Sequence, residues 1–152
     1  MNTHVTIDRP ALDGRAPRAV VRHLPATARI LLGVVFFVFG LNGFLHFLPQ
    51  PAPPERALAF VGALMGTGYM FPLIKGTETV VGALLLSNRL VPLALTLIAP
   101  IIVNIVAFHA ALEPSGLPLA IFVLALELFL AWAYRDAFRP MLAVQAKPRA
   151  GR

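Results

Sequence analysis

The segment MFPLIKGTETVVGALLLS, residues 70–87, decides the fold because it places a lysine and a glutamate inside a run of apolar residues. It is just long enough to cross the hydrocarbon core of a bilayer as a helix, which takes roughly 20 residues with a range of about 17–25. A charged group in such a segment is costly, so it usually faces the interior of a helix bundle and has a partner or a function. Glu78 is therefore our leading candidate for a functional residue, and Lys75 lies on the same helix face.

The composition of the whole chain supports a position in a membrane. Of its 152 residues 58% are hydrophobic and only 13% are charged, which is far more apolar than a soluble domain. In water such a chain would expose adhesive apolar patches. Its long apolar runs cover residues 30–48, 57–74, 80–86, 90–112 and 117–134. We therefore expect an all-α integral membrane protein that folds as a four-helix bundle.

The four expected spans are residues 30–48, 70–87, 90–111 and 117–134. The first ends at a series of prolines, Pro49 to Pro54, through which no helix can continue. Residues 55–66 could form a short amphipathic segment on the outer face, or residues 57–74 could themselves be the second span. We prefer the first alternative, because Pro72 then lies in the first helical turn, where proline is tolerated, and residues 87–89 form a tight turn.

Small residues and a proline give finer expectations about packing. Two glycine pairs permit close helix contact: Gly40 with Gly43, and Gly62 with Gly66. Pro100 lies inside the third span and removes the N–H that would bond the carbonyl of Thr96. We expect a kink and a free acceptor at that point.

The distribution of positive charge predicts how the bundle is oriented. Five arginines precede the first span and five basic residues follow the last, which is the positive-inside pattern. We expect both termini in the cytoplasm, with residues 1–28 as a disordered basic tail, residues 29–138 as the membrane domain and residues 139–152 as a second basic tail.

Nucleic-acid binding is not expected, because the basic residues lack a folded, aromatic-bearing surface. The chain has no cysteine, which excludes disulfides and thiolate metal sites.

Polar residues recur inside the other expected spans. Together with the two already named they make seven candidate ligand-binding residues: Asn42, His46, Lys75, Glu78, Asn104, His109 and Glu127. From the helical rise of about 1.5 Å per residue, nearly all of them lie in the outer half of the bundle, and Glu127 lies about 15 Å deep, near the midplane. The inner half should be plain packing. Asn104 and His109 are five positions apart, so they cannot both point at one site.

Each candidate also has a purely structural interpretation. Lys75 and Glu78 could neutralise each other while the lysine reaches the headgroups. The two asparagines could bond between helices, the two histidines could meet water at the interface, and Glu127 could be protonated or bonded across the bundle. The two histidines could ligate a haem, and with Glu78 they could bind zinc or iron. Both histidines lie near the surface and no ligand spacing is present, so we expect neither haem nor a metal site.

Three stretches of the chain resemble the DoxX family of small bacterial membrane proteins: ILLGVVFFVFGLNGFLHF, ALAFVGALMGTGYMFPLIKGTETVVGALLLSNRLVPLAL and APIIVNIVAFH. The matching pattern is a glycine-rich first span, a short outer helix, a second span with a central glutamate, here Glu78, and a tight turn with a basic residue, here Arg89. The resemblance implies a four-helix bundle in the bacterial cytoplasmic (inner) membrane. It also implies a link to quinone-coupled sulfur oxidation and to membrane redox complexes.

We therefore predict a membrane subunit or accessory protein of a redox system that binds quinone, or a similar amphipathic molecule, in the outer half of the bundle. Asn42, His46, Asn104 or His109 would hold the carbonyl groups, and Glu78 would exchange a proton. The partners would be the lipid bilayer and membrane or soluble redox proteins, and an oligomer is compatible with the sequence. Two alternatives stay open: a small proton-coupled transporter or channel that uses Glu78 and Glu127, and a non-catalytic scaffold. The sequence does not decide whether the protein is an enzyme.

Overall fold

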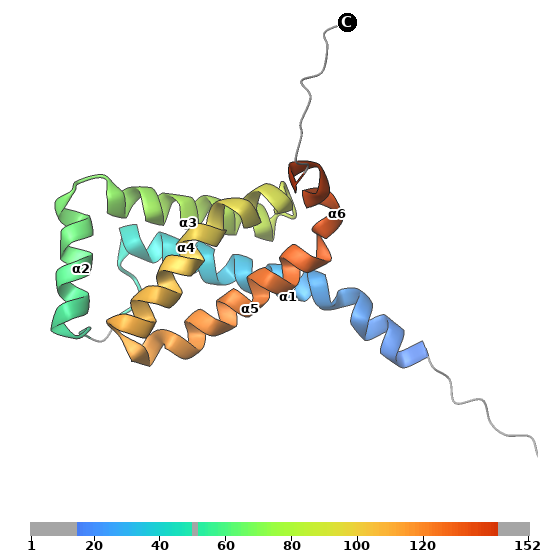
Figure 1. Cartoon of the computed structure of the whole chain (residues 1–152), viewed down its shortest axis with the longest axis horizontal. Coiled ribbons are helices and arrows are strands. Elements are labelled where there is room, and N and C mark those ends of the chain that lie inside the picture. Colours follow the sequence, from blue (N-terminus) through green and yellow to red (C-terminus); the bar gives the residue numbers. More distant parts are fainter. Residues whose placement is uncertain (1–14, 50–51, 143–152) are drawn as a thin grey trace, which may run out of the picture.

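The computed structural model describes residues 15–49 and 52–142, and every regular element within them is helical (Figure 1). The α-helices are α1 (Arg15–Leu45), α2 (Glu55–Gly66), α3 (Met70–Leu86), α4 (Val91–Ala111), α5 (Leu117–Ala133) and α6 (Arg135–Phe138). Two short 3₁₀ helices, η1 (Pro114–Gly116) and η2 (Arg139–Leu142), precede α5 and follow α6. For this part of the chain the prediction of an all-α protein is confirmed.

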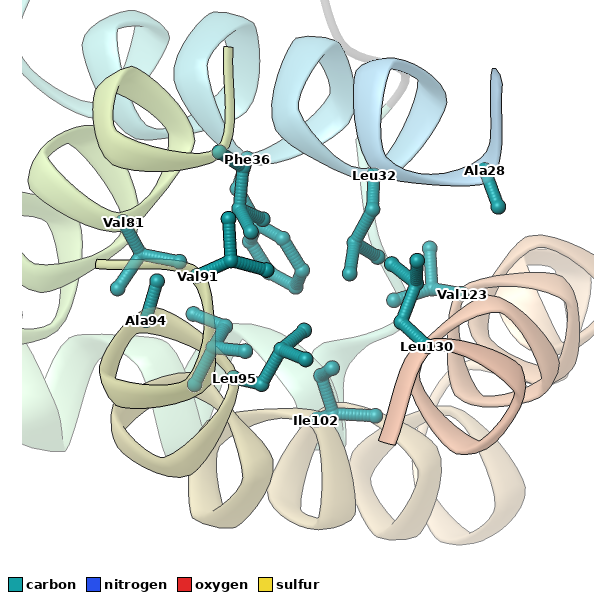
Figure 2. Packing of buried hydrophobic residues seen from close by; sticks show 12 residues of the cluster. Ala28, Leu32, Phe36, Val81, Val91, Ala94, Leu95, Ile102, Val123 and Leu130 are labelled. Atoms are coloured by element: carbon teal, nitrogen blue, oxygen red, sulfur yellow. The ribbon is translucent and has the colours of Figure 1, made fainter. Parts of the chain in front are cut away.

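The four long helices pack side by side in a ring, with α1 against α3, α3 against α4, α4 against α5, and α5 against α1. Figure 2 shows their apolar side chains meeting in the middle, with Leu32 and Phe36 of α1 facing Leu95 of α4 and Leu130 of α5. Each of these four residues is at most 2% exposed. This shared core fixes where the polar residues of each helix can point.

The ring has two distinct ends (Figure 1). At one end, which we call the α2 end, α2 lies across the bundle beside the start of α3, and its Phe60 ring is 5.6 Å from the Phe108 ring near the end of α4. At the opposite end, which we call the α6 end, α6 and η2 follow α5 near the start of α4. The polar candidates divide between these two ends.

Among the described residues, three helical segments are long and apolar enough to cross a bilayer: His23–Leu45, Val91–Ala111 and Pro114–Ala133. Helices α2 and α3 together give a fourth candidate, although they are bent by 93° at their junction. Apolar side chains also cover the outside of the ring, where Val103 is 63% exposed and Leu128 is 61% exposed. An apolar exterior of this kind marks a surface that contacts lipid or other apolar partners.

The junction between α2 and α3 decides between the two alternatives for this region. Gly68 has a φ of 76°, a left-handed conformation that glycine adopts without strain. The Thr67 hydroxyl accepts the N–H of Met70, the first residue of α3, at 3.0 Å. A continuous helix over residues 57–74 is therefore wrong. The preferred division into a short helix at 55–66 and a separate helix beginning at residue 70 is confirmed.

Helix α1 is longer than the sequence analysis predicts. Residues 15–28, expected to be part of a disordered tail, are helical, and the helix ends at Leu45 instead of Leu48. Pro25 lies inside it, where it removes one backbone donor without ending the helix, and the buried Ala28 extends the core to this turn. At the other terminus, residues 139–142 form a 3₁₀ helix. The rest of both expected tails, residues 1–14 and 143–152, lies outside the described residues.

Helices α1 and α3 approach each other closely along a line of glycines. A Cβ atom at Gly40 would lie 2.6 Å from the backbone nitrogen of Thr79, and a Cβ at Gly82 would overlap the backbone of Phe37. Because backbone atoms cannot give way as a flexible side chain can, neither position admits a larger residue. The antiparallel pair α1–α3 therefore depends on these two glycines.

The glycine predictions divide into one success and one failure. The close contact expected at Gly40 and Gly43 is confirmed, since a Cβ at Gly43 would lie 3.1 Å or less from three carbons of Lys75. The contact expected at Gly62 and Gly66 is wrong, because a Cβ at either position would have no neighbour within 4 Å. These two glycines lie in α2, which crosses the end of the bundle and does not pack along it.

Candidate functional site

Lys75 and Glu78 form an ion pair at the α2 end. The Lys75 Nζ atom lies 2.8 Å from Glu78 Oε2, and the Glu78 side chain is only 4% exposed while that of Lys75 is 22% exposed. The aliphatic part of Lys75 packs where Gly43 leaves room for it. This is the self-neutralising pair that the sequence left open, with the carboxylate buried and the ammonium group nearer the end of the bundle.

Asn42 closes the end of α1. It is 6% exposed, and its side-chain oxygen accepts the N–H of Leu48 at 2.7 Å. His46 follows the helix with a φ of 51°, in the left-handed region that commonly ends helices, and its side chain is exposed. The Asn42 amide oxygen thus shapes the chain reversal after α1, and the imidazole of His46 does not share a pocket with it.

Asn104 and His109 point to different surroundings, as their five-residue spacing predicts. Asn104 is exposed on the outward face of α4. His109 lies against the turn that follows α4, where its Nδ1 atom is 2.9 Å from the carbonyl oxygen of Glu113 and 2.7 Å from Glu113 Oε2. Neither side chain meets Glu78.

Glu113 is held by its neighbours in the loop between α4 and α5. The hydroxyl of Ser115 donates to one carboxylate oxygen, and His109 contacts the other. These two interactions, the Ser115 hydrogen bond first and then the charge of His109, hold the pKa of Glu113 below its usual value. His109, Glu113 and Ser115, which we call the loop cluster, thus join the end of α4 to η1.

Glu127 lies alone at the α6 end of the bundle. It is 6% exposed, and its Oε2 atom has no hydrogen-bond partner among the described residues. A groove of about 380 Å³ opens beside it, between α4 and α5. The residues that line this groove are Leu95, Thr96, Ala99, Glu127, Ala131, Arg135, Phe138 and Leu142. The walls are almost entirely apolar, and Glu127 is the one acidic residue in this lining.

The structure does not bring the seven candidates together. Lys75, Glu78 and Asn42 are bonded to near neighbours at the α2 end, His46 and Asn104 are exposed, and His109 belongs to the loop cluster. The half of the bundle nearest α6, expected to be plain packing, holds Glu127 and its groove. That expectation is wrong, because the gap between α4 and α5 depends on tertiary packing that hydropathy does not report.

Sequence reasoning also missed a buried cation. Arg29 is 9% exposed and donates to the carbonyl of Leu85, with a second contact of 3.4 Å to the carbonyl of Leu86. It therefore satisfies carbonyls at the end of α3, where the helix dipole favours a positive charge. The available signal was periodicity, since Arg29 shares a helix face with Gly33 and Gly40, which contact α3.

Arg135 also lines the groove beside Glu127. Its guanidinium carbon lies 4.9 Å from the centre of the Trp132 ring, and its Nη1 atom donates to the Trp132 carbonyl at 3.1 Å. Such stacking holds a cation in place without neutralising it. Within the described part of the chain, no group of three or more histidine, aspartate or glutamate side chains is placed to hold a metal ion.

Comparison with known proteins finds a bacterial relative of this chain. No family model matches the chain, and no solved structure matches it. A protein of Bacillus subtilis (strain 168), the uncharacterized protein YwoB, is 30% identical over 132 residues, which cover 82% of this chain and 86% of that protein. The match therefore spans more than four fifths of both chains.

Proposed function

This chain belongs to the same family as YwoB of Bacillus subtilis, and we propose that it is an integral membrane protein whose four spans form a bundle in the bacterial cytoplasmic membrane. Helices α1, α4 and α5 cross the bilayer as single apolar helices. Helix α3, with 17 residues, is at the short end of the spanning range, and α2 lies in the interface beside it. The apolar exterior of the ring supports this placement.

The α6 end faces the cytoplasm in this proposal. Arginines gather there, among them Arg29, Arg89, Arg135 and Arg139. The α2 end has no excess of positive charge, because Arg56 and Lys75 are outnumbered there by Glu55, Glu78 and Glu113. By the positive-inside rule the arginine-rich end is cytoplasmic, which also puts both termini on that side.

The protein binds a small amphipathic molecule of the quinone class in the groove beside Glu127. The single observation that carries this assignment is the Glu127 side chain, which lines an apolar groove while its buried Oε2 atom has no hydrogen-bond partner among the described residues. A volume of about 380 Å³ lies within the range of roughly 300–1,000 Å³ for small-molecule sites, which are mostly apolar with a few polar groups that fix orientation. A flat polar headgroup attached to an apolar tail matches such a lining.

Glu127 has the central part in this function. A neutral carboxyl group donates a hydrogen bond to a carbonyl oxygen, and a carboxylate accepts one from a hydroxyl, so Glu127 can hold either redox form of such a ligand. The Glu127 carboxyl group can also exchange a proton with the bound ligand. Arg135 and the exposed Thr96 border the groove, and apart from Glu127 the rest of its lining is leucine, alanine and phenylalanine. A bound quinone would supply two-electron, two-proton redox chemistry at this position.

The resemblance to the DoxX family supports the redox assignment, and the proposed ligand site differs from the one expected from the sequence. The expected site lay in the outer half, around Glu78 and the histidines. Lys75 already neutralises Glu78 there, whereas Glu127 Oε2 is buried without a partner among the described residues. The protein thus serves as a membrane subunit or accessory of a redox system, with its ligand near the cytoplasmic side.

Two measurements test this assignment. Gently solubilised protein should yield a quinone in its lipid extract, and a short-tailed quinone added at about 100 times its Kd should stabilise the protein by about 2.7 kcal/mol. The substitution Glu127→Gln preserves size and removes the carboxyl group, so it should abolish most of that stabilisation. The matched control is Glu113→Gln, which changes a carboxylate at the far end of the bundle and should leave the stabilisation intact.

The assignment fails if the purified protein carries no quinone and added quinone produces no thermal shift. It also fails if the shift survives unchanged in Glu127→Gln. A shift lost equally in Glu113→Gln would indicate a general loss of stability instead of a site at Glu127.

A second candidate function is proton-coupled transport, because two carboxyl groups, Glu78 in α3 and Glu127 in α5, are buried within the bundle. Buried acids in spanning helices are typical of proton relays. Proton flux into vesicles that contain the purified protein would favour this function if Glu78→Gln and Glu127→Gln each abolished it. Quinone binding without flux would favour the first function.

A further inference from the structure

The outward face of α4 carries an amide that the bundle does not use. Asn104 is exposed, lies about 10 Å from the Ala111 end of the helix by its rise per residue, and forms no hydrogen bond with another described residue through its side chain. An amide has two donor hydrogens and an acceptor oxygen. Within a hydrocarbon layer an amide without partners is strongly unfavourable, because no water is available to satisfy it.

Two threonine hydroxyls on the spanning helices, by contrast, have partners within their own helix. The Thr96 hydroxyl donates to the carbonyl of Pro92 at 2.9 Å, and the Thr77 hydroxyl donates to the carbonyl of Leu73 at 2.8 Å. A hydroxyl group can be satisfied in this way, whereas the two donors of an amide need more than one backbone carbonyl. Asn104 therefore calls for a partner outside the bundle.

The surroundings of Asn104 have the spacing of a helix–helix seam. The exposed residues of α4 include a series separated alternately by four and three positions: Leu93, Leu97, Pro100, Asn104, Ala107 and Ala111. This repeat of about 3.5 residues is typical of a seam between two packed helices. The small side chains at 107 and 111 would let a second helix approach closely on the half of α4 nearest the α2 end.

We propose that the protein forms a homodimer through this face of α4, with Asn104 of each copy hydrogen-bonded to Asn104 of the other. Two copies inserted with the same orientation are related by a twofold axis along the membrane normal, which places identical residues opposite each other at the same depth. An amide is complementary to itself, so no second type of residue is required. Helix α4 contains no lysine, arginine, aspartate or glutamate, so like charges do not oppose the contact.

The outward face of α5 provides the contrast. Its exposed side chains include Ile121, Phe122 and Leu128, which are 46–61% exposed and entirely apolar. Lipid chains satisfy such a surface without any protein partner. A single polar residue in an apolar seam is known to fix register and the number of chains, and α4 has such a residue.

Cross-linking of single-cysteine variants tests the dimer, because the natural chain has no cysteine. In native membranes Ala107→Cys, which keeps Asn104, should form a disulfide-linked dimer on mild oxidation. The matched control, Leu128→Cys on α5, should remain monomeric under the same conditions. Adding Asn104→Leu to Ala107→Cys should weaken dimerisation about 3- to 10-fold, as measured by the dimer fraction over a range of protein-to-lipid ratios.

The proposal is wrong if Ala107→Cys does not cross-link in the membrane fraction, if Leu128→Cys cross-links equally well, or if Asn104→Leu leaves the dimer fraction unchanged. A cross-link from Ala107→Cys to a different protein would also overturn it, and would assign this face to a heterologous partner. The inference rests on the proposed membrane placement but not on the ligand groove. Protein absent from the membrane fraction would overturn both, whereas membrane protein that dimerises normally in Glu127→Gln, with or without quinone, supports the dimer alone.

Discussion

The two ends of the bundle treat buried carboxyl groups in opposite ways. At the α2 end Glu78 is 3% exposed and bonded to Lys75, which shares its helix. At the α6 end Glu127 is 6% exposed, faces a groove and has no partner for its Oε2 atom among the described residues. Burial alone therefore does not distinguish a structural acid from a functional one. The distinguishing property is whether the protein itself satisfies the group.

The same contrast applies to the surrounding polar residues. The amide of Asn42 and the carboxylate of Glu113 each have a short hydrogen bond within their own end of the bundle. The groove at the α6 end brings together a carboxyl group, the Thr96 hydroxyl and the Arg135 guanidinium without any bond between them among the described contacts. Asn42 and Glu113 are thus satisfied within the protein at the α2 end, whereas the α6 end has room for a ligand.

Removing the lysine of the ion pair should have the largest effect on stability. In Lys75→Met the carboxylate of Glu78 stays buried without its counter-ion, which should lower the free energy of unfolding by about 3 kcal/mol. Denaturant unfolding in detergent micelles measures this loss. The double variant Lys75→Met with Glu78→Leu removes both charges and should recover most of the stability. If the double variant is as unstable as the single one, loss of the Lys75–Glu78 ion pair does not explain the lower free energy of unfolding.

Removing the buried arginine should have the next largest effect. Arg29→Gln leaves the last carbonyls of α3 without the charged donor that satisfies them, so we expect a loss of about 2 kcal/mol in unfolding free energy. Arg89→Gln is the matched control, because Arg89 is exposed in the turn between α3 and α4 and should cost less than about 0.5 kcal/mol. Equal losses in the two variants would contradict the structural part assigned to Arg29.

Much of the fold follows from the sequence, because the pattern of apolar runs and breakers is local. The glycines around residue 67 and the proline at position 72 identified the start of α3, and the apolar runs located α4 and α5. The extension of α1 to Arg15 was missed because three prolines and several charges precede the apolar run, and the stabilising contact of Ala28 with the core is a tertiary one.

The candidate site was less predictable, for a physical reason. The Lys75–Glu78 pair could be predicted from the sequence, because residues three positions apart are neighbours on one helix face. The bond from Asn42 depends on how the chain reverses after α1, and the groove beside Glu127 depends on the small residues Ala99 and Ala131 of two different helices. Such contacts are set by packing between segments that lie far apart in the sequence.

Replacing the two buried glutamates by leucine gives a direct comparison of the two ends. Glu127→Leu removes an unsatisfied polar group from an apolar wall, so the unfolding free energy should stay unchanged or rise by up to about 2 kcal/mol, while quinone stabilisation disappears. Glu78→Leu strands the ammonium group of Lys75 and should destabilise the protein instead. Unfolding curves of both variants, recorded under identical conditions, test the sign of each effect. A clear loss of stability in Glu127→Leu would show that the carboxyl group has a structural partner after all.

The smallest effect should come from acid at the loop cluster of the α2 end. Because the folded pKa of Glu113 lies below its usual value of 4.5, the contacts of its carboxylate stabilise the loop above that pH. This contribution is lost as the pH falls through the folded pKa. Hydrogen exchange of the backbone between residues 112 and 117 should therefore accelerate from about pH 5 downwards, relative to the intrinsic rate. The effect should be modest, since solvent screens charges at the end of the bundle. Glu113→Gln should remove this acceleration, and a variant that keeps it would place the titrating group elsewhere.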